Sequence, residues 1–356
     1  MYRFFRPLLF QLDPETAHGL TLNLIRLAGI LPPTRWLLQA MYAAPNRPVD
    51  AFGLEFKNPV GLGAGYDKDG LAWRGLAALG FGHIEIGTVT PLPQPGNPQP
   101  RIFRLAEDQA VINRMGFPGR GAEAVMKTLQ KSMFRRRINL LTGVPLSPVR
   151  LSAPAILGVN IGKNKQTPNE EAVFDYLALL QNFTPLADYL AINVSSPNTV
   201  GLRRLQERAA LEGLLAQLAH QRRLEQDRLK KNIPLLVKLA PDLTDSELDA
   251  ALDAILRTGM DGVIVTNTTL DRAGLRSTLG GESGGLSGRP LRVRSEAVLA
   301  HTLKKLDSRL PVVSVGGIMN PEDAKRRLDM GAALVQVYTG LVYTGPGLVK
   351  QIVKSL

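Results

Sequence analysis

The residues with the clearest potential for chemistry are two neighbouring serines. Ser195 and Ser196 follow the apolar run DYLAINV (188–194) within the stretch INVSSPNT, which has an asparagine on each side of the pair. A polar turn that closes a strand is the commoner explanation of such a stretch. The alternative is that one hydroxyl takes part in a reaction, and the local sequence leaves both interpretations open.

Polar residues also follow or interrupt several other apolar runs. They are Lys68, Thr88, Asn160, Lys238, Thr266, Asn267, Thr268, Tyr338 and Thr339. Lys238 stands inside the run PLLVKLA (234–240), where an unpaired charge would be costly. We expect it either in a buried ion pair or as a cation that stabilises negative charge on a bound ligand.

Three glycine-containing segments indicate a phosphorylated ligand. They are GGESGGLSGRP (280–290), VGGI (315–318) and YTG (338–340). Glycine lets the backbone approach an anion closely, and a phosphate site between the last two strand-end loops recurs in barrels. Each glycine pair alone is typical of a tight turn, but together they favour a phosphorylated cofactor.

Eight short apolar runs, separated mostly by amphipathic segments, must position these residues. They span 58–65, 83–89, 155–161, 188–194, 234–240, 261–267, 311–317 and 333–339, with helical patterns such as 202–221 and 246–259 between them. Continuous apolar runs are typical of parallel strands buried on both faces. Eight such units predict a (β/α)8 TIM barrel rather than a doubly wound open sheet. The polar residues then lie at the C-terminal ends of the strands, where barrel active sites are found.

The composition excludes several kinds of chemistry. The 356 residues contain no cysteine, so a disulfide, a thiolate metal site and a cysteine nucleophile are excluded. With 4 histidines, no metal site is expected. The net charge of +12 is compatible with nucleic acid, an anionic membrane surface or anionic small molecules. No run reaches the roughly 18 apolar residues of a transmembrane helix.

Two segments do not follow this alternation of predicted strands and helices. Residues 1–48 are interpreted as an amphipathic helical module ahead of a barrel at 49–356, with helices expected at 16–30 and 34–42. These helices either cap the bottom of the barrel or lie on a membrane surface. The irregular segment 127–152 carries only basic charges, which favours a solvated surface excursion or a contact with anionic lipid.

The sequence closely resembles class 2 dihydroorotate dehydrogenases, the quinone-dependent flavoenzymes of pyrimidine synthesis, over nearly its whole length. The motifs that carry the resemblance are FQLDPETAH (10–18), GLGAGYDKDG (61–70), EIGTVTPLPQPGNPQPRIFRL (85–105), NRMGF (113–117), GVNIGKNK (158–165), INVSSPNTVGLR (192–203), VKLAPDL (237–243), VTNTTLDR (265–272), GGLSGRPL (284–291), SVGGI (314–318) and VQVYTG (335–340). Pro118 departs from the family, which usually has asparagine there.

The resemblance implies a barrel that binds one FMN, with dihydroorotate on one face of the flavin. The FMN-binding residues that it implies are Ala64, Gly65, Tyr66, Asp67, Lys68, Thr88, Asn160, Asn193, Lys238, Thr266, Gly288, Gly317, Tyr338 and Thr339. For dihydroorotate or orotate it implies Lys68, Asn113, Arg114, Met115, Gly116, Phe117, Asn193, Asn198, Asn267 and Thr268. These types suit a ligand with a carboxylate and a ring of amide groups.

The resemblance also assigns different roles to the two serines. The catalytic base of this family is the second serine of the SSPN motif, here Ser196, and Ser195 is expected to be structural. Ser196 would take a proton from C5 of dihydroorotate while C6 passes a hydride to the flavin. A neutral serine is a poor base, so we expect a proton relay through a nearby threonine or water. The related class 1 enzymes use cysteine as the base, which this chain lacks.

The location and the second substrate follow from the same resemblance. The module 1–48 is expected to lie on an anionic membrane and to admit ubiquinone or menaquinone to the flavin in a ping-pong reaction. We expect a monomer, peripheral to the cytoplasmic face of a bacterial inner membrane, with no nucleic-acid partner.

One alternative is another FMN barrel such as a tRNA dihydrouridine synthase, which depends on a cysteine. The other is a basic nucleic-acid-binding module, which needs a basic stripe with interleaved aromatic residues.

Overall fold

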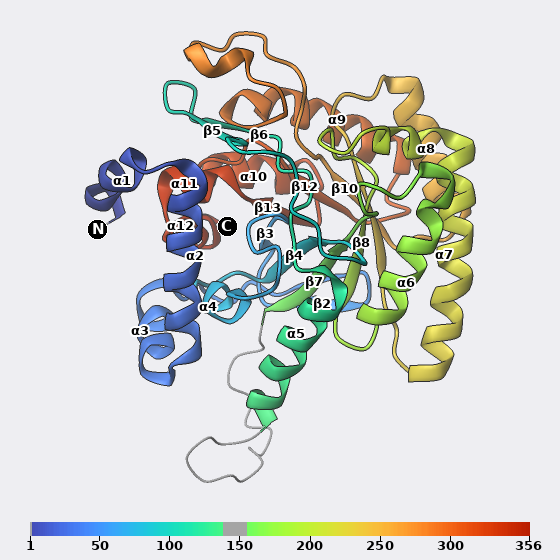
Figure 1. Cartoon of the computed structure of the whole chain (residues 1–356), viewed down its shortest axis with the longest axis horizontal. Helices are drawn as coiled ribbons and strands as arrows, with labels where there is room; N and C mark the ends of the chain where they lie inside the picture. The colour runs from blue at the N-terminus through green and yellow to red at the C-terminus, as the bar shows by residue number, and fades with distance from the viewer. Residues whose placement is uncertain (1, 138–154) are drawn as a thin grey trace.

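The protein is represented by a computed structural model, which describes residues 2–137 and 155–356, apart from the side chains of Arg3 and of residues 133–137. Its centre is a closed barrel of eight parallel strands (Figure 1). In chain order they are β3 (Val60–Leu62), β4 (His83–Val89), β7 (Ile156–Ile161), β8 (Tyr189–Asn193), β9 (Leu235–Leu239), β10 (Gly262–Val265), β12 (Val312–Val315) and β13 (Leu334–Val337). Each lies within or on one predicted run, so the (β/α)8 prediction is confirmed and the open sheet is wrong.

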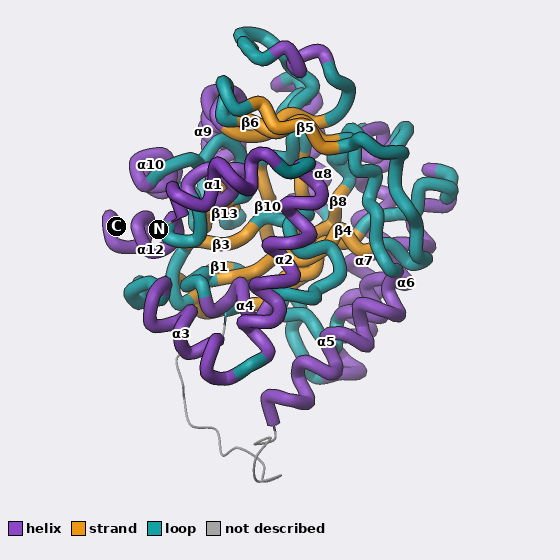
Figure 2. The backbone as a smooth tube through the Cα atoms, turned by 60° about the vertical axis from the view of Figure 1, so that its left-hand side comes forward, coloured by secondary structure: helices purple, strands orange, loops and turns teal. Residues whose placement is uncertain are grey.

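Helices surround the barrel and follow its strands (Figures 1 and 2). They are α4 (Trp73–Ala78), α5 (Gly121–Arg137), α6 (Ala172–Phe183), α7 (Arg208–Leu229), α8 (Asp245–Arg257), α9 (Arg292–Leu306), α10 (Pro321–Asp329), α11 (Thr339–Thr344) and α12 (Leu348–Ser355), with α1 (Tyr2–Gln11), α2 (Pro14–Ile30) and α3 (Pro32–Tyr42) before the barrel. The helices predicted within 202–221 and 246–259 correspond to α7 and α8. The first begins later than predicted, because Glu207 has an extended backbone with ψ 138° and separates α7 from a 3₁₀ turn.

A β-hairpin closes the N-terminal end of the barrel. Its strands β1 (Val49–Ala51) and β2 (Leu54–Phe56) pair antiparallel. Phe52 and Phe56 are buried in a cluster with side chains from the barrel interior. A Cβ added to Gly262, the first residue of β10, would lie 2.3 Å from the ring of Phe52. The hairpin therefore fills this opening, and the expectation that the N-terminal helices cap the bottom of the barrel is wrong.

The N-terminal helices lie beside the barrel, with α2 and α3 against α4 and α1 against α11 (Figure 2). α2 approaches α4 closely because glycines stand at the contact. A Cβ added to Gly29 would lie 2.4 Å from the backbone nitrogen of Gly75, and one added to Gly75 would lie 2.1 Å from the carbonyl oxygen of Ile25. The outward faces of the module expose large apolar side chains, namely Phe4, Phe5, Leu8, Leu12, Leu20, Leu24, Leu27, Leu31, Trp36, Leu37 and Met41. Among the described residues, no helix combines the length and the apolar character needed to cross a membrane.

Two features differ from the sequence-based expectations. The strands β5 (Ile102–Leu105), β6 (Ala110–Asn113) and β11 (Gly285–Gly288) form an antiparallel sheet that was not predicted. The basic segment 127–152 begins inside helix α5, not in an irregular excursion, because Val125 and Leu129 bury one face of that helix. Residues 138–154, which make up the rest of the segment, lie outside the described part of the chain.

Candidate active site

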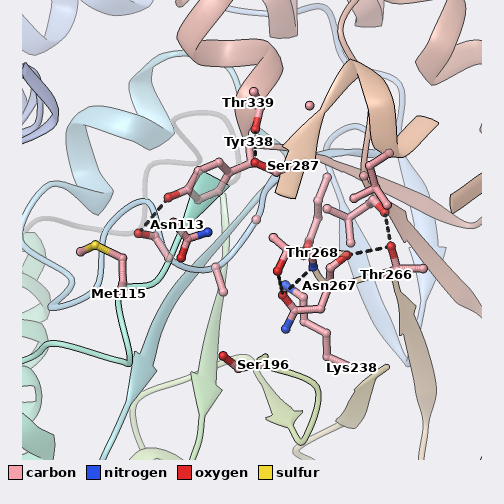
Figure 3. A pocket seen from close by; sticks show the side chains of 18 of the residues that line it. Asn113, Met115, Ser196, Lys238, Thr266, Asn267, Thr268, Ser287, Tyr338 and Thr339 are labelled. Atoms are coloured by element: carbon pink, nitrogen blue, oxygen red, sulfur yellow. Dashed lines mark hydrogen bonds between the residues drawn. The ribbon is translucent and has the colours of Figure 1, made fainter. Parts of the chain in front are cut away.

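A cavity opens at the C-terminal ends of the barrel strands, where Asn113 of β6 and Ser287 of β11 also line it (Figure 3). The predicted site residues that line it are Ala64, Gly65, Lys68, Thr88, Asn113, Met115, Gly116, Phe117, Asn193, Ser196, Asn198, Lys238, Thr266, Asn267, Thr268, Gly288, Gly317, Tyr338 and Thr339. Figure 3 shows Tyr338 on one side of this space and Lys238 and Thr268 on the opposite side. The barrel therefore brings together residues from most of the length of the chain.

Four predicted residues, Tyr66, Asp67, Asn160 and Arg114, are not part of the cavity lining. Asp67 accepts hydrogen bonds from the backbone N–H groups of Leu71 and Ala72 at 2.9 and 2.8 Å, and burial raises its pKa to about 6. Arg114 pairs with Glu282 at 2.6 Å. Asp67 thus orders the loop before α4, and Arg114 ties the end of β6 to the glycine-rich segment.

A buried carboxylate beneath the cavity organises the polar side chains inside the barrel. Glu85 on β4 accepts hydrogen bonds from Asn160 Nδ2 at 2.9 Å, Tyr189 OH at 3.1 Å and Gln336 Nε2 at 2.8 Å. The ammonium of Lys238 lies 3.6 Å from Glu85 Oε1. Lys238 is therefore in a buried ion pair, which is one of the two alternatives expected from its sequence context, and it also lines the cavity.

The two serines have different surroundings. Ser195 is fully buried, donates a hydrogen bond to Asn193 Oδ1 at 3.1 Å and accepts one from Asn267 Nδ2 at 2.9 Å. Ser196 lines the cavity, and its Oγ accepts a hydrogen bond from the backbone N–H of Asn198 at 3.2 Å. Ser195 therefore holds two amide side chains in place, while the hydroxyl of Ser196 lies at the wall of the cavity.

Glycines bring the backbone against the cavity at the ends of β11 and β12. Gly288, Gly316 and Gly317 have φ of 98°, 117° and 72°, in the region that favours glycine. A Cβ added to Gly288 would lie 2.4 Å from Gln109 O, and one added to Gly317 would lie 2.4 Å from the Cα of Arg292. Only glycine fits at these two positions, and the result is a surface made of backbone that suits a phosphate.

Aromatic rings connect the cavity with helix α2. Tyr338 lines the cavity, and its ring centroid is 5.7 Å from that of Tyr66. The ring of Tyr66 meets His18 of α2 edge-on, with the centroids 5.0 Å apart. Burial lowers the pKa of His18 to about 4, so this imidazole is neutral at pH 7. Burial also lowers the pKa of Lys68, whose ammonium donates to Gly65 O at 3.0 Å.

The closed barrel, the polar cavity at its C-terminal mouth and the paired cation at the cavity floor define a (β/α)8-barrel enzyme. The chain belongs to the dihydroorotate dehydrogenase family, because the sequence model of "Dihydroorotate dehydrogenase" matches residues 48–356. This confirms the resemblance found in the sequence.

Similar proteins agree with this family. The "Dihydroorotate dehydrogenase (quinone)" of Idiomarina loihiensis is 45% identical over 356 residues, which cover 100% of both chains. The protein of the same name from Acidithiobacillus ferrooxidans is 48% identical and is matched over 100% of this chain and 94% of its own. The crystal structure of DHODH in complex with ferulenol from Eimeria tenella superposes with a TM-score of 0.86 at 40% identity, covering 96% of this chain and 90% of that one.

Proposed function

We propose that this protein oxidises (S)-dihydroorotate to orotate, with FMN as its flavin and a membrane quinone as the final electron acceptor, in pyrimidine biosynthesis. The family and the relatives named "Dihydroorotate dehydrogenase (quinone)" support the reaction. The observation that carries the site is the cavity at the barrel mouth, where Ser196, Lys238 and several asparagines surround one space. The family match also speaks against a tRNA dihydrouridine synthase and a nucleic-acid-binding module.

The lining of the cavity fits FMN. Gly288, Gly316 and Gly317 leave backbone, without side chains, beside the space where a phosphate would lie. Lys238 presents a positive charge to a ring that gains negative charge on reduction. Gln336 Oε1, also in the lining, is buried without a partner among the described residues and can accept from a ligand donor. FMN, when bound, accepts a hydride and passes electrons to the quinone.

The asparagines and Lys68 fit the substrate. Dihydroorotate carries a carboxylate and ring amides, which require a cation and groups that both donate and accept hydrogen bonds. Asn113, Asn198 and Asn267 line the cavity, and Asn198 Nδ2 donates to Asn113 Oδ1 at 3.1 Å. Lys68 supplies the cation in the same lining. We assign the carboxylate to Lys68 and the ring amides to the asparagines.

Ser196 is the proposed base. The backbone N–H of Asn198 that donates to its Oγ stabilises negative charge on that oxygen as the proton leaves. Three positions further on, the hydroxyl of Thr199 is buried without a partner among the described residues. Thr199 is therefore available as the threonine of the expected proton relay, which a neutral serine needs at pH 7.

The quinone is proposed to approach from the side of residues 1–48. Phe4 is 82% exposed and Trp36 69% exposed, and side chains of this kind suit the interface of a bilayer. The rings of His18, Tyr66 and Tyr338 connect this side with the cavity. Separate approaches for the two substrates suit a ping-pong reaction by a monomer that is peripheral to the cytoplasmic face of a bacterial inner membrane.

The experiment that tests the proposal is anaerobic. Protein purified in detergent is mixed with L-dihydroorotate while the visible absorbance of the flavin is followed. We expect bleaching, and recovery on addition of a ubiquinone analogue but not of fumarate or NAD. Bound flavin that dihydroorotate leaves oxidised would overturn the substrate assignment, and a colourless protein would overturn the cofactor.

A further inference from the structure

A second hollow lies outside the candidate active site. It is a groove of about 670 Å³ between α2, α4, the loop at 91–93 and helix α5 as far as Ser132, and it shares no lining residue with the active-site cavity. Figure 2 shows α2, α4 and α5 on the same side of the molecule. The groove therefore lies between the N-terminal module and the barrel helix that opens the basic segment 127–152.

The groove is strongly basic. The basic residues in its lining are Arg26, Arg74, Arg120, Lys127 and Lys131. The lining contains one carboxylate, that of Glu123, which Lys127 pairs at 2.5 Å. No salt bridge joins Arg26, Arg120 or Lys131 to a carboxylate within the part of the chain that the structure describes. Three cations from separate segments thus face one groove without internal neutralisation.

The same groove contains buried donors without acceptors. Trp73 is only 6% exposed and lines the groove, and its indole N–H has no acceptor among the described residues. The hydroxyl of Ser132 is likewise buried and unpartnered. Buried polar groups in proteins are nearly always paired, so an unpaired donor beside three cations indicates a ligand with several negative oxygens. Phosphate is the common group with this chemistry.

The position of the groove indicates that this phosphate belongs to a lipid. Arg26 and Ile30 of α2 line the groove, and Leu27, which follows Arg26 in the same helix, belongs to the exposed apolar surface of the module. Leu31, the extended residue directly after α2, belongs to that surface as well. Neighbouring residues of a helix are about 100° apart around its axis, so the groove and the apolar surface are adjacent faces. A phospholipid whose acyl chains contact Leu27 and Leu31 can place its headgroup in the groove.

We propose that this groove binds the phosphate of an anionic phospholipid headgroup and so fixes the orientation of the barrel on the membrane. The proposal deepens the membrane association proposed above and rests on it. It assigns a role to Arg120 and Lys131, which lie on the barrel side of the groove and are distant in sequence from the N-terminal module.

Vesicle binding by the FMN-bound full chain tests the site. The triple variant R26Q/R120Q/K131Q is compared with R208Q/R223Q/K304Q, which removes the same charge from exposed positions on α7 and α9. On vesicles of phosphatidylglycerol and phosphatidylcholine, we expect the groove variant to lose affinity on the order of 100-fold, since each of the three cations near such a surface contributes roughly fivefold. The control should lose only a few-fold. Equal losses would overturn the proposal, because binding would then depend on net charge alone.

Tryptophan fluorescence distinguishes a phospholipid headgroup from free inorganic phosphate as the ligand of the groove. The chain has 2 tryptophans, so W36F leaves Trp73 as the only one. Soluble short-chain phosphatidylglycerol should change the emission of Trp73, whereas the matching phosphatidylcholine and millimolar inorganic phosphate should not. An equal response to inorganic phosphate would overturn the lipid assignment, and no response to phosphatidylglycerol would overturn the site.

Bleaching of the flavin by dihydroorotate is measured in the same proteins. It should be unchanged in the groove variant, because no groove residue lines the active-site cavity. A wild-type protein that fails to bleach would count against the proposed reaction, while the vesicle and fluorescence comparisons would still decide the groove.

Discussion

Ser196 and Ser195 differ by one position, and their loss should have different effects. Ser196→Ala removes the proposed base, so anaerobic flavin reduction by dihydroorotate should slow by roughly 10²–10⁴-fold while FMN stays bound. Ser195→Ala is the matched control. It removes the hydroxyl that holds Asn193 and Asn267, so it should mainly weaken dihydroorotate binding and leave the limiting rate within about tenfold. Stopped-flow absorbance measures both quantities. An Ser196→Ala protein that reduces its flavin at the normal rate would assign the base to another group.

Glu85 is the residue whose loss should damage the barrel interior most. Glu85→Gln leaves Lys238 without its anionic partner and places an extra amide donor among Asn160 and Gln336. Removing one member of a buried ion pair costs about 3–5 kcal/mol of the free energy of unfolding. Tyr189→Phe removes only one hydrogen bond to the same carboxylate and should cost about 1 kcal/mol. Urea unfolding of the two variants gives both numbers, and equal losses would show that the ion pair contributes little.

Two glycines of helix α2 provide a matched test of how the N-terminal module is attached. A Cβ at Gly29 would lie 2.4 Å from Gly75, so Gly29→Ala should force α2 away from α4 and cost about 1–3 kcal/mol. Gly19 lies on the same helix with no atom within 4 Å of an added Cβ, so Gly19→Ala should stabilise by up to about 1 kcal/mol through helix propensity. Thermal unfolding and limited proteolysis of the module report the difference. A stable Gly29→Ala variant would mean that the two helices are not held in close contact.

The elements that could be predicted from the sequence are those marked by a pattern of residues within one short segment of the chain. All eight barrel strands are short apolar runs, and their C-terminal polar residues lie where the barrel requires them. The sheet β5–β6–β11 depends on pairing between Asn113 and Gly285, which no local pattern shows. The partner of Lys238 was also missed, because β4 and β9 are not neighbours in the barrel and meet only across its interior. Glu85, like Lys238, is a single charged residue within an apolar run of the sequence. Two opposite charges in such positions could have been predicted to form a buried ion pair.

At the scale of the whole molecule, a histidine inside the barrel should make the fold sensitive to acid. Burial lowers the pKa of His83 to about 3, whereas an unfolded histidine has its ordinary pKa of 6.5. Between these values the unfolded chain binds a proton that the folded chain does not, so stability falls as the pH falls. The contribution of His83 to this slope is at most about 1.4 kcal/mol per pH unit. His83→Gln should reduce the slope measured by urea unfolding between pH 6 and pH 4. If the variant and the wild-type protein lost stability with the same slope over this pH range, His83 would not be the source of the acid sensitivity.

The two halves of the proposed reaction should respond separately to changes on the membrane side of the molecule. Leu24 and Leu27 are 56% and 59% exposed on α2, and L24E/L27E places two carboxylates on the proposed membrane face. Loss of their insertion should reduce vesicle binding and flavin reoxidation by a membrane-bound quinone by at least about tenfold. Reduction by dihydroorotate should be unchanged, because neither leucine lines the active-site cavity.

The matched control for this variant is L224E/V293E, on exposed positions of α7 and α9. It adds the same charge away from the module, so neither half-reaction should change. If L24E/L27E slowed both half-reactions equally, the two substrates would share one approach and the ping-pong arrangement would be wrong. If it slowed neither, the quinone would reach the flavin by a path that does not involve this face of α2.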